Sequence, residues 1–224
     1  MQPDIRILDD PATEAAARLA EATGHVVLTG GSTPKGAYER LAELRPDWSG
    51  THIWFTDERA VAPDHEFSNY AMIKGALLDR IEGATVHRMK GELGPEEGAA
   101  DHVREYEAAG SPRFSLMLIG LGPDGHVCSL FPGHDELGIR DRPVAGVEMS
   151  GLAPFVGRIT FTLPVVNATD ELLVLVKGED KAEAVARAFA GPPDPRTPAS
   201  LLRPESGNLT VLLDPAAASR LEAH

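Results

Sequence analysis

The chain has 224 residues, of which 42% are hydrophobic and 25% charged, and its formal net charge is −13. This length and composition predict a single domain with a full hydrophobic core, over residues 1–224. The excess of 34 acidic over 21 basic residues argues against nucleic acid and anionic membranes as partners, although a few local cations can still hold a small anion. No apolar run approaches the ~18 residues that a membrane span requires, so we expect no contact with a membrane core.

The start of the chain and its cysteine content bear on its compartment. The first ten residues, MQPDIRILDD, are acidic and lack the basic and apolar regions of a secretory signal. Cys128 is the one cysteine, so no internal disulfide forms, as is usual in a reducing compartment. These features predict a cytoplasmic protein.

Helix-like and strand-like patterns alternate along the chain. The patterns predict helices over residues 11–22, 32–44, 69–81, 95–109, 180–190 and 215–223, with a further helix beginning within 127–131. They predict strands over residues 25–29, 52–56, 84–88, 114–119, 158–163, 171–176 and 208–213. Residues 164–168 are expected to break a strand, 133–157 to form a loop, and the proline-rich 191–204 to cross the surface. Alternating strands and helices predict an α/β fold with a largely parallel sheet and helices on both faces.

The most informative stretch follows the apolar strand predicted at 114–119. Gly120, Gly122 and Gly125 let the backbone turn sharply there, and Asp124 and His126 place an acid and a base two residues apart. Open α/β sheets bind ligands at the carboxyl ends of their strands, so this turn is a candidate active site. The glycines also spell G-x-G-x-x-G, but Pro123 and a carboxylate occupy the place where a dinucleotide's pyrophosphate would lie. A purely structural turn remains the alternative.

Two other strand ends carry candidate ligand groups. Gly30, Gly31, Ser32 and Thr33 connect the strand at 25–29 to a helix N-terminus, where backbone N–H groups and the helix dipole favour an anion such as phosphate. An ordinary capped turn would use the same residue types. The charged residues 57–59 follow the strand at 52–56, where they either contact substrate or are simply solvated.

Four stretches resemble one known family in the family's own order. They are LTGGSTP at 28–34, TDERAV at 56–61 with SNY at 68–70, GLGPDGHVCSLFPG at 120–133, and RITFTLPVVN leading to VKGEDKA at 158–182. They are similar to the family that contains 6-phosphogluconolactonases and glucosamine-6-phosphate deaminases. Two features resemble the lactonase branch. SLFPG follows the D-G-H turn, where deaminases have a sequence like NEP, and D-E-R ends in arginine, where deaminases have a sequence like D-E-Y. The resemblance implies a single-domain, modified doubly wound, Rossmann-like sheet.

The resemblance also implies hydrolysis of 6-phosphoglucono-δ-lactone, a step of the oxidative pentose phosphate pathway. In that reaction His126 would be the general base, because an imidazole with an ordinary pKa of about 6.5 can accept a proton from water near neutral pH. Asp124 would orient the imidazole, or instead cap the following helix. Arg59 would stabilise the developing oxyanion or bind substrate hydroxyls, and Asp57 would bind a hydroxyl. A covalent route through Ser129 or Cys128 is disfavoured, because no G-x-S-x-G elbow is present.

The remaining expectations concern binding. Arg158 and Lys181 resemble the family's phosphate-binding cations and would act with residues 30–33, although either could be a solvated surface charge. No cofactor is expected, and the spacing of His126, His134, Asp124 and Cys128 matches no trusted zinc pattern. The expected partner is a small sugar-phosphate lactone, and the protein would be a monomer or small homo-oligomer. The alternatives are an amino-sugar-phosphate deaminase or isomerase, and a non-catalytic sugar-phosphate sensor of the same fold.

Overall fold

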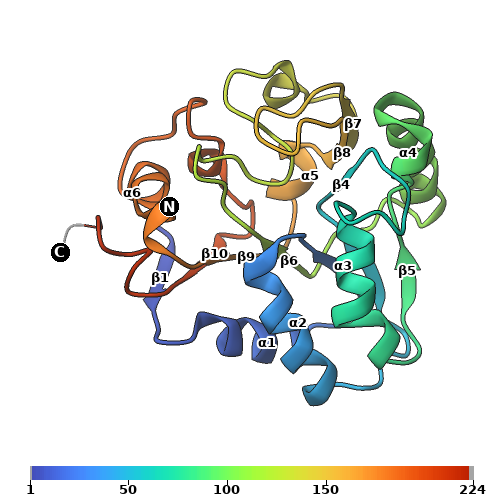
Figure 1. Ribbon diagram of the computed structural model, residues 1–224, viewed down its shortest axis with the longest axis horizontal. Helices are drawn as coiled ribbons and strands as arrows, with labels where there is room; N and C mark the ends of the chain where they lie inside the picture. The colour runs from blue at the N-terminus through green and yellow to red at the C-terminus, as the bar shows by residue number, and fades with distance from the viewer. Residues whose placement is uncertain (1, 222–224) are drawn as a thin grey trace.

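Seven strands form an all-parallel sheet that runs through the molecule (Figure 1). The computed structural model describes residues 2–221. The strand order is β1-β10-β9-β6-β2-β3-β5, with bounds β1 (Asp4–Ile7), β10 (Asn208–Leu213), β9 (Glu171–Val176), β6 (Leu116–Ile119), β2 (His25–Leu28), β3 (His52–Phe55) and β5 (Thr85–His87). Six of these strands were predicted from the sequence. The exception is β1, a four-residue edge strand with little burial.

Helices cover both faces of this sheet, as the sequence predicts. They are α1 (Pro11–Glu21), α2 (Ser32–Leu44), α3 (Asn69–Ala76), α4 (Pro95–Ala108), α5 (Leu163–Asn167) and α6 (Ala182–Phe189). Successive strand residues enter different cores: Val26 and Leu28 pack with residues of α1, α2 and α3, whereas Val27 packs with residues of α4 and α6. Side chains alternate across a strand, so a sheet covered on both faces needs continuous apolar runs. The doubly wound α/β architecture is therefore confirmed.

A second, antiparallel sheet was not predicted. It consists of β4 (Asp57–Arg59), β8 (Arg158–Phe161) and β7 (Val144–Val147), and α4 packs against β7 and β8. The charges at 57–59 therefore lie in a strand and not in a loop, and the expected loop at 133–157 contains β7 and a 3₁₀ turn, Asp135–Gly138. The strand expected at 158–163 is present, but it joins this small sheet.

Other expectations were wrong in detail. Residues 127–131 form no helix, because Cys128 adopts a φ of 55° and Leu130 N–H donates to the Val127 carbonyl in a tight turn. The helix expected to reach residue 81 ends at Ala76, and a 3₁₀ turn, Leu78–Arg80, follows. The strand β8 does stop before residues 164–168, as expected. Most of these residues belong to the short helix α5.

Two segments near the C-terminus also differ from expectation. The proline-rich 191–204 is partly internal: Thr197, Ala199 and Ser200 are buried, and Ala199 N–H donates to the Gly125 carbonyl at 2.9 Å. Of the helix expected at 215–223, residues 215–220 form turns, and 222 and 223 lie outside the described residues.

Within residues 2–221, no helix is both long and apolar enough to cross a bilayer.

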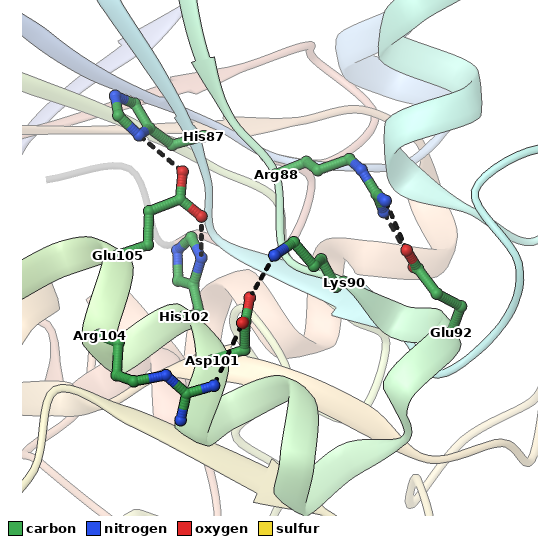
Figure 2. Close-up of polar contacts among 8 residues, drawn as sticks. All are labelled: His87, Arg88, Lys90, Glu92, Asp101, His102, Arg104 and Glu105. Atoms are coloured by element: carbon green, nitrogen blue, oxygen red, sulfur yellow. Dashed lines mark hydrogen bonds and ion pairs between the residues drawn. The ribbon is translucent and has the colours of Figure 1, made fainter.

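Hydrogen bonds and ion pairs join β5 and the residues after it to α4 (Figure 2). His87 Nδ1 lies 2.8 Å from Glu105 Oε1, and the same histidine's Nε2 lies 2.9 Å from His52 Nδ1. Lys90 Nζ is paired with Asp101 at 2.9 Å. The imidazoles of His102 and His87 together lower the pKa of Glu105 to about 2. Since a carboxylate only accepts, His87 donates to it through Nδ1–H, and His87 Nε2 accepts a hydrogen bond from His52 Nδ1–H.

Glu105→Gln is expected to lower the free energy of unfolding at pH 7 on the order of 2 kcal/mol, because the charged acceptor for His87 is lost. Folding lowers the pKa of Glu105 from 4.5, so its stabilisation is complete above about pH 4.5 and disappears as the pH falls through 2. Denaturant unfolding at pH 7 and pH 3 should therefore show a smaller difference between wild type and variant in acid. The exposed Glu107, on the same helix, provides the control Glu107→Gln; an equal loss there would contradict the assignment.

Candidate active site

A pocket of about 240 Å³ opens at the carboxyl ends of β2, β6 and β9. All predicted site residues except Asp124 line it, namely Gly30, Gly31, Ser32, Thr33, Asp57, Arg59, His126, Arg158 and Lys181. They come from segments far apart in the chain, because parallel strands bring their carboxyl ends to one edge of the sheet.

The turn after β6 holds His126 against Asp124. Asp124 Oδ1 lies 2.6 Å from His126 Nδ1 and also accepts the His126 backbone N–H at 3.1 Å. Gly122 makes this packing possible, because a Cβ there would lie 2.1 Å from His126 Nδ1. Gly125 takes a φ of 92°, which lets the chain reverse between the acid and the base. With Nδ1–H donated to the carboxylate, Nε2 is left as the basic nitrogen.

Asp124 thus orients the imidazole and caps no helix. Since residues 127–131 form a turn, the helix that it was expected to cap as an alternative does not exist. Burial acts to raise the pKa of Asp124, but the hydrogen bond and charge of His126 outweigh it, and the pKa is lowered. Asp124 is therefore an anion at neutral pH and favours the imidazolium that proton uptake by His126 would create.

Hydrogen bonds hold Asp57 at the pocket wall. Its Oδ1 accepts from Thr56 Oγ1 and its Oδ2 from Ser129 Oγ, both at 2.7 Å. Ser129 therefore points its proton at a carboxylate and has no imidazole as its hydrogen-bond partner. Burial, with the nearby charge of Asp57, raises the pKa of the Cys128 thiol well above its ordinary value. Neither residue is activated as a nucleophile.

Arg59 and Arg158 face each other across the small sheet, because they form a cross-strand pair in the register of β4 and β8. Arg158 is only 4% exposed and donates from Nη2 to the Pro154 carbonyl at 2.9 Å. Within the described part of the chain, its Nε and Nη1 have no hydrogen-bond partner. Burial, assisted by the charge of Arg59, lowers the pKa of Arg158 to about 10, so the group stays protonated. A buried guanidinium with unused donors favours an anion within its reach.

The N-terminus of α2 adds further anion-binding groups. Gly31 precedes the helix with a φ of 113°, and Ser32 and Thr33 occupy the first turn. Among the described residues, the N-cap position of this helix makes no side-chain capping hydrogen bond, so the helix N–H groups and dipole are available at the pocket. Lys181, at the end of the 3₁₀ turn Glu179–Lys181, also lines the pocket and contributes a cation.

Sequence reasoning missed several lining residues. Asn69, Lys177, Phe131, Leu152 and Ala153 also border the pocket. Asn69 lies within the motif SNY at 68–70, so that motif is the sequence signal for it. The segment carrying Leu152 and Ala153 had no periodic pattern to indicate that it would reach the site.

Comparison with known proteins places the chain in one family. A family model described as glucosamine-6-phosphate isomerases/6-phosphogluconolactonase matches residues 7–211. A 6-phosphogluconolactonase from Synechocystis is 37% identical over 208 residues, which cover 88% of this chain and 85% of that protein.

Two solved structures are also similar. A 6-phosphogluconolactonase from Thermotoga maritima is 30% identical with a TM-score of 0.83, covering 95% of this chain and 99% of that one. The 6-phosphogluconolactonase of Trypanosoma cruzi is 25% identical with a TM-score of 0.87, covering 100% of this chain and 99% of that one. The chain therefore belongs to the glucosamine-6-phosphate isomerase/6-phosphogluconolactonase family.

Proposed function

We propose that the protein hydrolyses 6-phospho-D-glucono-1,5-lactone to 6-phospho-D-gluconate, as its lactonase relatives do by name, in the oxidative pentose phosphate pathway. The observation that carries the proposal is Arg158, a buried cation with unused donors, in the same pocket as a carboxylate-held histidine. The first feature suits a phosphate and the second suits activation of water, so together they fit a phosphorylated ester.

His126 is the general base of the proposed mechanism. Its Nε2 removes a proton from a water molecule while the water oxygen attacks the lactone carbonyl carbon. The negative charge that develops on the carbonyl oxygen is stabilised by Arg59, and Asp57 contacts the substrate hydroxyls. The tetrahedral intermediate collapses by breaking the bond to the ring oxygen, which takes the proton from the imidazolium. The product acid then ionises to the carboxylate.

The phosphate is held by other groups than those that act on the reacting carbonyl. Arg158, Lys181 and the N-terminus of α2 with residues 30–33 hold it by charge-assisted hydrogen bonds. No covalent intermediate is needed, because a lactone is an activated ester, and Ser129 is held by Asp57.

The activity is tested with freshly prepared lactone, by coupling product formation to a 6-phosphogluconate dehydrogenase and subtracting the spontaneous opening. We expect saturable hydrolysis that exceeds the background. Ammonia release from glucosamine 6-phosphate would instead assign the protein to the deaminase branch, and binding of sugar phosphate without turnover would indicate a sensor.

Activity is expected to survive exhaustive chelation. Within residues 2–221, no group of at least three His, Cys, Asp or Glu side chains is arranged to hold a metal ion. The base and the anion-binding groups are instead supplied by side chains and backbone. The measurement is the initial rate after dialysis against EDTA, with an undialysed sample as control. A loss of turnover that zinc or magnesium restores would contradict this expectation.

A further inference from the structure

Asn69 bridges two parts of the pocket that bind different ends of the proposed substrate. Its Nδ2 donates to the Asp57 carbonyl at 2.8 Å, on the strand that carries Arg59. The same amide packs against Gly30, so closely that a Cβ on Gly30 would lie 1.8 Å from Asn69 Oδ1. Gly30 belongs to residues 30–33, which lead into α2 and are called the phosphate cradle below. Gly30 is therefore a glycine because Asn69 occupies the space where a side chain would begin.

Glu58 fixes the position of Asn69. It alternates with Asp57 and Arg59 along β4, and unlike them it does not line the pocket. It is 3% exposed, and its two carboxylate oxygens accept from the N–H groups of Arg59, Asn69 and Tyr70 at 2.7, 2.7 and 2.8 Å. Ser68 Oγ donates to it as well, at 3.0 Å.

These hydrogen bonds to the Glu58 carboxylate connect the first turn of α3 to β4. Burial raises the pKa of Glu58, whereas the four donors around it favour the charged carboxylate. Each oxygen has two donors, so the carboxylate fixes both the strand and the helix N-terminus. One side of β4 thus carries the groups that face the substrate, and the other carries the acceptor that holds α3 and Asn69 against them.

We propose that Asn69 is a positioning residue for the lactonase reaction: it sets the distance between the phosphate cradle at Gly30 and the Asp57–Arg59 strand. The inference rests on the proposed function. Phosphate binding at one end can align the carbonyl at the other only if the two groups are rigidly connected. The Asn69 side-chain amide is that connection, and Glu58 holds the Asn69 backbone from which it extends.

The test compares phosphorylated with unphosphorylated gluconolactone. Asn69→Ala should lower kcat/KM for the phosphorylated lactone about 10-fold, while the value for gluconolactone changes little, because only the former uses the cradle. The preference for the phosphorylated substrate should therefore shrink by the same factor. A role in folding alone would lower the rates on both substrates equally.

Asn167→Ala is the matched control. Asn167 also connects two backbone segments, through bonds to the Leu201 carbonyl at 3.1 Å and the Arg203 N–H at 2.7 Å, but it does not line the pocket. It should alter thermal stability without altering the substrate preference. An unchanged preference in Asn69→Ala, or an equal change in the control, would overturn the inference.

Gly30→Ala provides a second variant, in case Asn69→Ala folds poorly. Its Cβ displaces the amide, so Gly30→Ala should reduce the preference as Asn69→Ala does, and the double variant should be no worse than either alone. Additive losses would show that the two residues act separately and would count against the inference. Absence of lactonase activity in the wild type would instead refute the proposed function.

Discussion

His126→Asn is expected to lower kcat on 6-phosphogluconolactone by about 10²–10⁴-fold, with little change in KM. Asparagine keeps a polar group of similar size at the pocket wall, but it cannot accept a proton from water. Asp124 would still be present, 2.6 Å from where His126 Nδ1 now lies, so the loss is confined to the base. Such a pattern identifies an interaction that is used in the transition state and not in substrate binding.

The measurement is steady-state kinetics with the spontaneous opening of the lactone subtracted at each pH. His134→Asn is the control, since this histidine lies near the pocket, 5.4 Å from Phe131 between ring centroids, but does not line it. The control should keep full activity. Near-normal turnover in His126→Asn would show that His126 is only part of the turn.

The wild-type enzyme should lose kcat/KM as the pH is lowered, because protonation of the imidazole removes the general base. Since the background reaction quickens at high pH, only the acidic limb is diagnostic, and His126→Asn should lack it. A variant that retained the same limb would place the titrating group elsewhere.

Much of this architecture could be predicted from local sequence. The run at 171–176 predicted β9, because a strand covered by helices on both sides carries apolar residues at consecutive positions. The D-G-H turn was correctly placed at the pocket, because it directly follows such a strand. In both cases the information lies within a few neighbouring residues.

The errors came from contacts between distant parts of the chain. The Asp57–Arg59 strand has three charged residues, and its strand character depends on pairing with β8, about a hundred positions later. The left-handed conformation of Cys128, which excludes a helix at 127–131, is likewise not marked by a glycine. Asn69 shows the same limit for the site, because its position depends on Gly30, Asp57 and Glu58 together.

The strongest expected effect on substrate binding is that of Arg158→Ala. It should raise KM for the phosphorylated lactone by about 10- to 150-fold, the equivalent of the 1.5–3 kcal/mol that a charge-assisted contact contributes. kcat should change less, because a group remote from the carbonyl binds the ground state and the transition state to similar extents. Unphosphorylated gluconolactone should be a poor substrate and almost insensitive to the change.

Stability separates this binding role from a structural one. Arg158 is buried opposite Arg59, and its lowered pKa means that the fold disfavours its charge. Arg158→Ala should therefore keep or raise the thermal midpoint while weakening substrate binding. Arg113→Ala, which removes an exposed ion pair with Asp170, should leave KM unchanged. If Arg158→Ala instead lowered activity on both lactones equally, together with the thermal midpoint, Arg158 would serve the fold, and the phosphate would have to be held by Lys181 and the α2 N-terminus.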